Sequence, residues 1–294
     1  MVPINSGDVG EVSKAGVALL DRVSEALGWI LKPVQIKRIA KAETEASMIR
    51  AEGEIQITEL QRRAFTRLLA EESRAQENIE AIAFQAVPLL AANAPFQEMN
   101  DDWITNFFDK CRIISDEQMQ QLWSKVLAGE ANQPGSFSKR TVNLLGSMDK
   151  NDASQFSRLC SFNVMIQEEW NPLIYSLSEP FYKEHNITDE VLRHLDSIGL
   201  IAFMDAGYIY RTDCPKIMDI RYHERRLKLE FLHDINTMPM GRVEWTQAGR
   251  ELAILCEAEE ITELVEWMLE LFNSSRSPIR IKNGIVAVSL TLVS

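Results

Sequence analysis

The sequence predicts a mainly α-helical protein with a small α+β part, built from a long N-terminal helix, a helical middle domain and a C-terminal winged-helix-like domain. One observation behind this prediction is the stretch from Val34 to Val87, which has no proline and a single glycine. It is rich in Ala, Glu, Arg and Gln, which are strong helix formers. The other observation is a change near Pro172, after which short segments alternate apolar and polar side chains, as half-buried strands do.

At 294 residues the chain is too long for one ordinary core, so two or three domains are expected. Pro33 ends the first helix, because the residue before a proline is pushed out of the α region, and Pro88 and Pro95 mark a second break. The expected parts are an amphipathic N-terminal helix at 1–33, a long charged helix at 34–94, a helical domain at 95–171 and a winged-helix-like α+β domain at 172–294.

The first helix carries one apolar face, because apolar side chains recur at steps of three and four residues from Val12 to Leu31. Four charged residues between Lys14 and Glu25 exclude a membrane-spanning helix. The face could still contact a membrane surface through residues 12–31. Its polar side has few basic residues, so packing in a core or contact within an oligomer is favoured.

The long helix has a thin apolar stripe with steps of three, four and seven residues, the spacing of a helix-pairing seam. A lone helix this polar is marginal in water without a partner. We therefore expect it to pair, either within the chain or between copies of the chain. Pairing between copies is favoured, which predicts a homo-oligomer that binds a further protein partner.

A compact motif lies between Ser115 and Arg140. Ser115 is a capping residue with Gln118 three residues on, which predicts the start of a helix. The motif could bind a polar ligand through Glu130 and Arg140, but it contains no nucleophile or base with an orienting partner, so a structural role is favoured. In that interpretation Trp123 anchors the core, Pro134 and Gly135 make a turn, and Glu130 pairs with Arg140 across it. The motif residues are Gln120, Trp123, Glu130, Pro134, Gly135 and Arg140.

The C-terminal part suggests a winged helix, because a helix at 187–198, capped by Thr188, is followed by short strands and a helix at 246–252. The helix that would enter a DNA groove is rich in Asp and Glu, which is a poor surface for phosphates. A basic patch lies nearby, and a solvated wing or a protein contact explains it better than nucleic-acid binding. The patch consists of Arg221, His223, Arg225, Arg226 and Lys228.

Composition and motifs argue against several function classes. A net charge of −12 lowers the expectation of nucleic-acid binding. The four histidines and four cysteines show no metal-ligand spacing, and phosphate-binding and nucleophile motifs are missing from the sequence. We therefore expect no catalytic residue, no cofactor and no metal, and a protein that is not an enzyme. The polar start at 1–10 is not a secretory signal, so a cytoplasmic protein is expected.

The segment SDEQMQQLWSKVLAGEANQPGSFSKR, from Ser115 to Arg140, resembles a bacterial family of unknown function catalogued as DUF 2806. The resemblance extends to ESRAQENIE, which ends at Glu80, and to IGLI and TQAGREL further on. The chain is also more loosely similar to the helical alpha proteins associated with abortive infection. These resemblances imply no known activity, cofactor or catalytic residue, and suggest a setting in phage defence.

The resulting hypothesis is a non-enzymatic, oligomerising interaction protein in bacterial phage defence. One alternative is a winged-helix regulator that binds nucleic acid through the basic patch. Another is a peripheral membrane effector that acts through the first helix.

Overall fold

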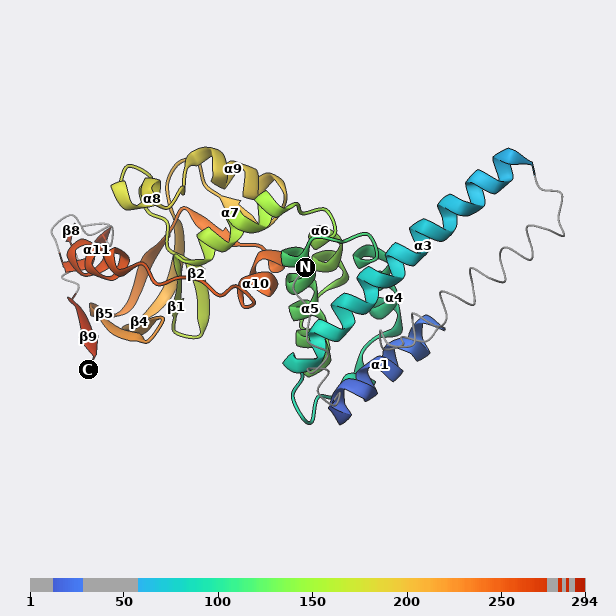
Figure 1. Ribbon diagram of the computed structural model, residues 1–294. Helices are drawn as coiled ribbons and strands as arrows, with labels where there is room; N and C mark the ends of the chain where they lie inside the picture. Colours follow the sequence, from blue (N-terminus) through green and yellow to red (C-terminus); the bar gives the residue numbers. More distant parts are fainter. Residues whose placement is uncertain (1–12, 29–57, 274–279, 282–283, 286–288, 294) are drawn as a thin grey trace, which may run out of the picture. The chain divides into compact units, whose positions relative to one another are not determined.

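The computed structural model describes residues 13–28, 58–273, 280–281, 284–285 and 289–293 (Figure 1). The chain divides into two compact units, residues 1–146 and residues 147–294. The described part of the first unit is helical, whereas the second unit combines helices with antiparallel strands.

Each described α-helix of the first unit begins at a polar residue whose side chain accepts a hydrogen bond from a backbone N–H of the first turn. Asp116 has this role in α5, where the sequence had favoured Ser115. The elements are α1 (Lys14–Leu27), α3 (Glu59–Ala86), α4 (Asp101–Cys111), α5 (Glu117–Asn132) and α6 (Lys139–Leu145), with 3-10 turns η1 (Val87–Leu89) and η2 (Phe96–Glu98).

Helix α3 is shorter than the helix expected from Val34 to Val87. It begins at Glu59, because Thr58 is in an extended conformation and forms a capping box with Gln61. The sequence left open whether the helix is continuous, and the cap at Thr58 now places a helix start inside the segment. Residues 34–57 lie outside the described part of the chain. The far end matches the expected break, because Pro88 lacks the N–H that would continue the helix.

The core of the first unit is aromatic. Trp103 stacks on Phe107 with ring centroids 5.1 Å apart, and Phe107 meets Trp123 edge to face at 5.0 Å. All three side chains are buried, and Trp123 is buried completely. This cluster joins α4 to α5, which also packs against α3.

Helix α1 uses its apolar face inside the first unit. Leu19 and Val23 are fully buried, and α1 packs against α4. Arg22, also buried, donates to the Met99 carbonyl at 2.7 Å and forms an ion pair with Asp101. Gly28 ends the helix in the left-handed conformation with φ 70°, before the proline at which the sequence placed the end. No helix among the described residues is long and apolar enough to cross a membrane.

The second unit contains five helices and nine strands in its described residues. Thr188 caps α9, as the sequence predicted, by accepting from the N–H of Val191. The helices are α7 (Lys150–Cys160), α8 (Pro180–Glu184), α9 (Asp189–Ser197), α10 (Gln247–Ala253) and α11 (Thr262–Asn273). The strands are β1 (Asn163–Ile166), β2 (Glu169–Pro172), β3 (Ile201–Phe203), β4 (Ile209–Tyr222), β5 (Arg225–Gly241), β6 (Val243–Trp245), β7 (Arg280–Ile281), β8 (Gly284–Ile285) and β9 (Ser289–Val293).

A five-stranded antiparallel sheet in the order β2-β1-β4-β5-β9 forms the centre of this unit, and β3 pairs with β6 (Figure 1). The expected fold class, mainly α with a small α+β part, is therefore wrong, and the protein is α+β. The winged-helix-like arrangement is not supported by this sheet. Its expected wing is the hairpin of β4 and β5, which has 14 and 17 residues and occupies the middle of the sheet.

The sequence predicted only short pieces of this hairpin, because its alternation is broken. The register between the strands shifts between Arg211 and Cys214 and again between Pro215 and Ile217, and Asp213 has φ 57°. Each shift moves the side chains that follow it to the other face of the sheet. The alternation of apolar and polar residues therefore does not continue along the whole strand.

The boundary between the units lies after Gly146, whereas the sequence placed it between residues 171 and 172. Hydrogen bonds explain the difference. Strand β1 pairs with β4, and the Tyr222 hydroxyl donates to the Ser161 carbonyl at 2.7 Å, so α7, β1 and β2 belong with the sheet.

Gly249 provides a test of the packing in the second unit. A Cβ at this position of α10 would lie 1.9 Å from the carbonyl oxygen of Leu200, which is backbone and cannot move aside. Gly249→Ala is expected to lower the free energy of unfolding by about 1–3 kcal/mol or more, the cost of overpacking. Urea unfolding measures the change. Gly146→Ala is the control, because the atoms nearest to its Cβ would lie 3.4 Å away, an ordinary van der Waals contact. An equal effect of both substitutions would contradict the packing.

Candidate functional site

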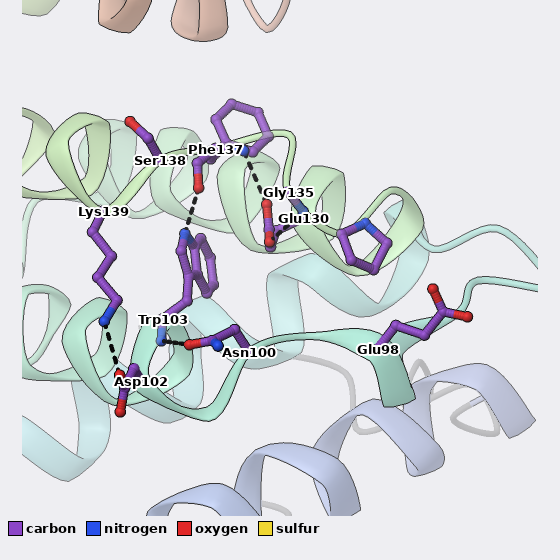
Figure 2. Close-up of a pocket in the computed structure, with 10 residues that line it drawn as sticks. Glu98, Asn100, Asp102, Trp103, Glu130, Gly135, Phe137, Ser138 and Lys139 are labelled. Atoms are coloured by element: carbon purple, nitrogen blue, oxygen red, sulfur yellow. Dashed lines mark hydrogen bonds and ion pairs between the residues drawn. The ribbon is translucent and has the colours of Figure 1, made fainter.

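The turn after α5 is held by Glu130, whose side chain is 2% exposed. Its carboxylate accepts hydrogen bonds from the backbone N–H groups of Gly135 at 2.7 Å and Phe137 at 2.9 Å (Figure 2). Gly135 has φ 88°, a conformation that favours glycine. Glu130 therefore supplies the acceptors that the turn lacks.

A cavity of 580 Å³ lies beside this turn (Figure 2). The Trp103 indole N–H donates to the Phe137 carbonyl at 2.6 Å, and Lys139 forms an ion pair with Asp102 at 3.3 Å. The polar groups of the cavity wall are thus engaged with one another, which favours a structural role over ligand binding. The lining residues are Glu98, Asn100, Asp102, Trp103, Glu130, Pro134, Gly135, Phe137, Ser138 and Lys139.

The remaining motif residues lie apart from this cavity. Gln120 is buried and donates to the Ile114 carbonyl at 2.9 Å and to the Asn78 side chain of α3 at 3.3 Å. Arg140 is exposed in the first turn of α6. The Glu130 carboxylate accepts from the backbone N–H groups of Gly135 and Phe137, where the sequence had suggested a pair with Arg140. Asn78 was missed because its partner Gln120 is 42 residues away.

The five residues of the basic patch do not form one cluster in the structure. Arg225 forms an ion pair with Glu260 at 2.7 Å, and His223 occupies the hairpin turn with φ 49°. Arg221 and Arg226 lie directly opposite each other on β4 and β5, and Lys228 faces Asp219 two residues further along. Arg221, Arg226 and Lys228 therefore share one face of the sheet.

His223 lines a second cavity, of 330 Å³, together with the thiols of Cys160 and Cys256. Burial raises the pKa of the Cys160 thiol, and the neighbouring Cys256 raises it further. Burial also raises the pKa of Tyr222 to about 12, and its hydroxyl accepts from the Ile261 N–H at 2.7 Å. The cavity is lined by Cys160, Asn163, Trp170, His223, Ala253, Ile254, Cys256, Glu257 and Ala258.

A His–Asp pair that the sequence did not indicate joins α9 to α7. The Nε2 atom of His194 lies 2.6 Å from Oδ1 of Asp152. Oδ2 of the same carboxylate accepts from the Asp149 N–H in the capping box of α7. A carboxylate in this position orients the imidazole ring. The two residues are 42 positions apart, so no local spacing marks them.

These features define an α+β protein of two units, with cavities of 580 and 330 Å³. Among the residues that the structure describes, no group of three or more His, Cys, Asp or Glu is placed to hold a metal ion. A family model described as "Protein of unknown function (DUF2806)" matches residues 62–269, and the chain belongs to this family. No curated protein and no solved structure matches the chain. The looser similarity to abortive-infection proteins is not shown by these comparisons.

Glu130→Gln tests the structural role of the turn. The amide NH₂ of glutamine would face a backbone N–H in place of one carboxylate oxygen, so a buried donor loses its acceptor. We expect the free energy of unfolding to fall by about 1–3 kcal/mol. Chemical denaturation measures it, with Glu98→Gln as the control, because Glu98 is an exposed residue of the same cavity. If the two variants were equally stable, Glu130 would not be the residue that holds the turn.

Thiol labelling tests the environment of the cysteines. The thiolate is the form that reacts, and burial raises the pKa of Cys111 and of Cys160 above the ordinary value for a thiol. In the native protein at pH 8, iodoacetamide should therefore modify Cys256, which is only half-buried, well before Cys111 and Cys160. Peptide mass spectrometry measures the order, and labelling in denaturant should make the rates similar. Labelling of Cys111 first in the native protein would refute the expectation.

Proposed function

We propose that the protein is a non-enzymatic interaction protein that self-associates through the first half of α3. The observation that carries this proposal is a segment at residues 59–74, here called the α3 overhang. Every residue of the overhang is exposed except Leu69, which is half-buried, whereas the second half of α3 is buried against its unit. In Figure 1 the overhang extends beyond α4 and α5.

The α3 overhang exposes large apolar side chains. Leu60 is 69% exposed, Phe65 45% and Leu68 51%. Leu60 and Leu68 lie on one face of the helix at multiples of four residues, with Ala64 between them. Water contact with such side chains is unfavourable by about 25 cal/mol per Å² of apolar surface, so pairing with a second copy is favourable.

Ion pairs within the overhang support this assignment. Arg62 pairs with Glu59 at 2.8 Å, and Arg67 pairs with Glu71 at 3.5 Å. These charges are partnered along the helix itself, so they need no partner across an interface. The apolar stripe between them is then available to a second copy, and this arrangement resembles a helix-pairing seam.

Other roles receive less support. The apolar face of α1 is occupied by packing within its own unit, which disfavours membrane contact through residues 12–31. The polar groups of the Glu130 turn are engaged with the backbone, which supports a non-enzymatic protein. The setting in phage defence and a further protein partner stay predictions from the sequence.

Light scattering on the full chain tests the proposed self-association. The wild-type chain should form a multimer, and Leu60→Glu/Leu68→Glu should dissociate it, because two charged side chains would replace two apolar contacts. Burial of each leucine contributes about 1.5–3 kcal/mol, so the dissociation constant should rise at least about a hundredfold.

The control variant is Ile113→Glu, which places a charge on an apolar residue that is 74% exposed outside the overhang. It should leave the mass in solution unchanged. A monomeric wild-type chain, or a double variant that keeps the wild-type mass, would contradict self-association through the α3 overhang.

A further inference from the structure

A row of side chains crosses four strands of the five-stranded sheet. Trp170 on β2 lies opposite Met165 on β1, Met165 lies opposite Arg221 on β4, and Arg221 lies opposite Arg226 on β5. Directly opposed residues share a face of the sheet. Both arginines are exposed, and Trp170 and Met165 are half-buried. This set of four residues is called the Trp–Arg row below.

The two arginines form an unfavourable pair on their own. Like charges directly opposite each other on neighbouring strands are destabilising. In the part of the chain that the structure describes, neither Arg221 nor Arg226 forms an ion pair, although Arg211 and Arg225 of the same hairpin each do. Lys228, in the next position on this face, adds a third cation, with Asp219 opposite it. The protein has a net charge of −12, yet here two guanidinium groups lie side by side without an acidic partner among the described residues. Such a pair can bind an anion from outside the protein.

Trp170, at one end of the row, indicates that the anion carries a planar group. The guanidinium of Arg221 lies 5.7 Å from the centre of the Trp170 ring, so the charge and the indole are adjacent. Trp170 also lines the 330 Å³ cavity together with Asn163 and His223. A planar group beside Trp170 would therefore find both an aromatic neighbour and polar side chains.

We propose that the Trp–Arg row binds single-stranded nucleic acid, with Arg221 and Arg226 on backbone phosphates and a base against Trp170. Exposed arginines combined with an aromatic platform are the recurring elements of such sites. The row lies on a five-stranded sheet, which is wider than the helix or two-stranded ribbon that a major groove admits, whereas a single strand can lie along such a surface. Asp219 and Glu230, exposed on the same hairpin, limit the contact to a few phosphates. The site does not depend on self-association through α3.

Fluorescence anisotropy with labelled oligothymidine and oligouridine tests the proposal on the full chain. Arg221→Gln/Arg226→Gln should weaken binding at least about tenfold at low salt. Because each phosphate contact contributes about −0.7 to the slope of log K against log salt, the slope should become shallower by about 1.4. Trp170→Leu should weaken binding about fivefold or more without changing the salt slope, since stacking carries no charge.

The matched control is Lys183→Gln/Lys216→Gln, which removes two exposed cations of the same unit away from the row. It should bind like the wild-type chain. Absence of binding by the wild-type chain at low salt overturns the proposal, as does an equal loss in the control and the arginine variant. The proposal is also overturned if polyglutamate of equal charge displaces the oligonucleotide and Trp170→Leu leaves its binding unchanged. That result would assign the surface to an acidic protein. Circular dichroism of each variant verifies that it is folded.

Discussion

The antiparallel pairing of β4 with β5 is the constraint on which the second unit depends. Strands β1 and β9 add to its two edges, so segments at either end of the unit are ordered by the same hairpin. Near its turn, Tyr222 donates to the Ser161 carbonyl after α7 and accepts from the Ile261 N–H before α11. One buried hydroxyl therefore fixes two helices relative to the sheet, and such bonds are costly to leave unmade. The pairing also sets which charges share a face, because a shift of one residue would turn each side chain over.

The first unit is organised by a different principle, the satisfaction of backbone groups at the ends of helices. Each described α-helix begins with a side-chain cap, and Glu130 extends the same function to the turn after α5. A buried carboxylate is expensive unless it is fully hydrogen-bonded, and here the turn supplies the donors. The buried Trp123 and the bonds of Glu130 give this segment a role in packing and turn formation. The α3 overhang is the part of this unit that its own described residues leave uncovered.

Sequence patterns predicted the helices of both units well, because caps and apolar periodicity are local signals. Thr188 and the break at Pro88 are examples. The sheet was underestimated because the bulges near Asp213 and Pro215 disrupt the alternation on which strand prediction depends. The sites were predicted less completely. The basic patch was found as a set of neighbours in sequence, but the register separates Arg225, which pairs with Glu260, from Arg221 and Arg226. Trp170 could not be joined to the patch, since only the pairing of β1 with both β2 and β4 brings it there.

The opposed arginines have a thermodynamic consequence for the unit that carries them. Their repulsion lowers the stability of the folded sheet, and an anion bound between them removes that cost only in the folded state. By linkage, a ligand that binds the native state alone stabilises it by RT ln(1 + [L]/Kd). The thermal midpoint of the second unit would then report on the occupancy of the sheet face. Folding of the second unit and binding of its ligand would then be coupled.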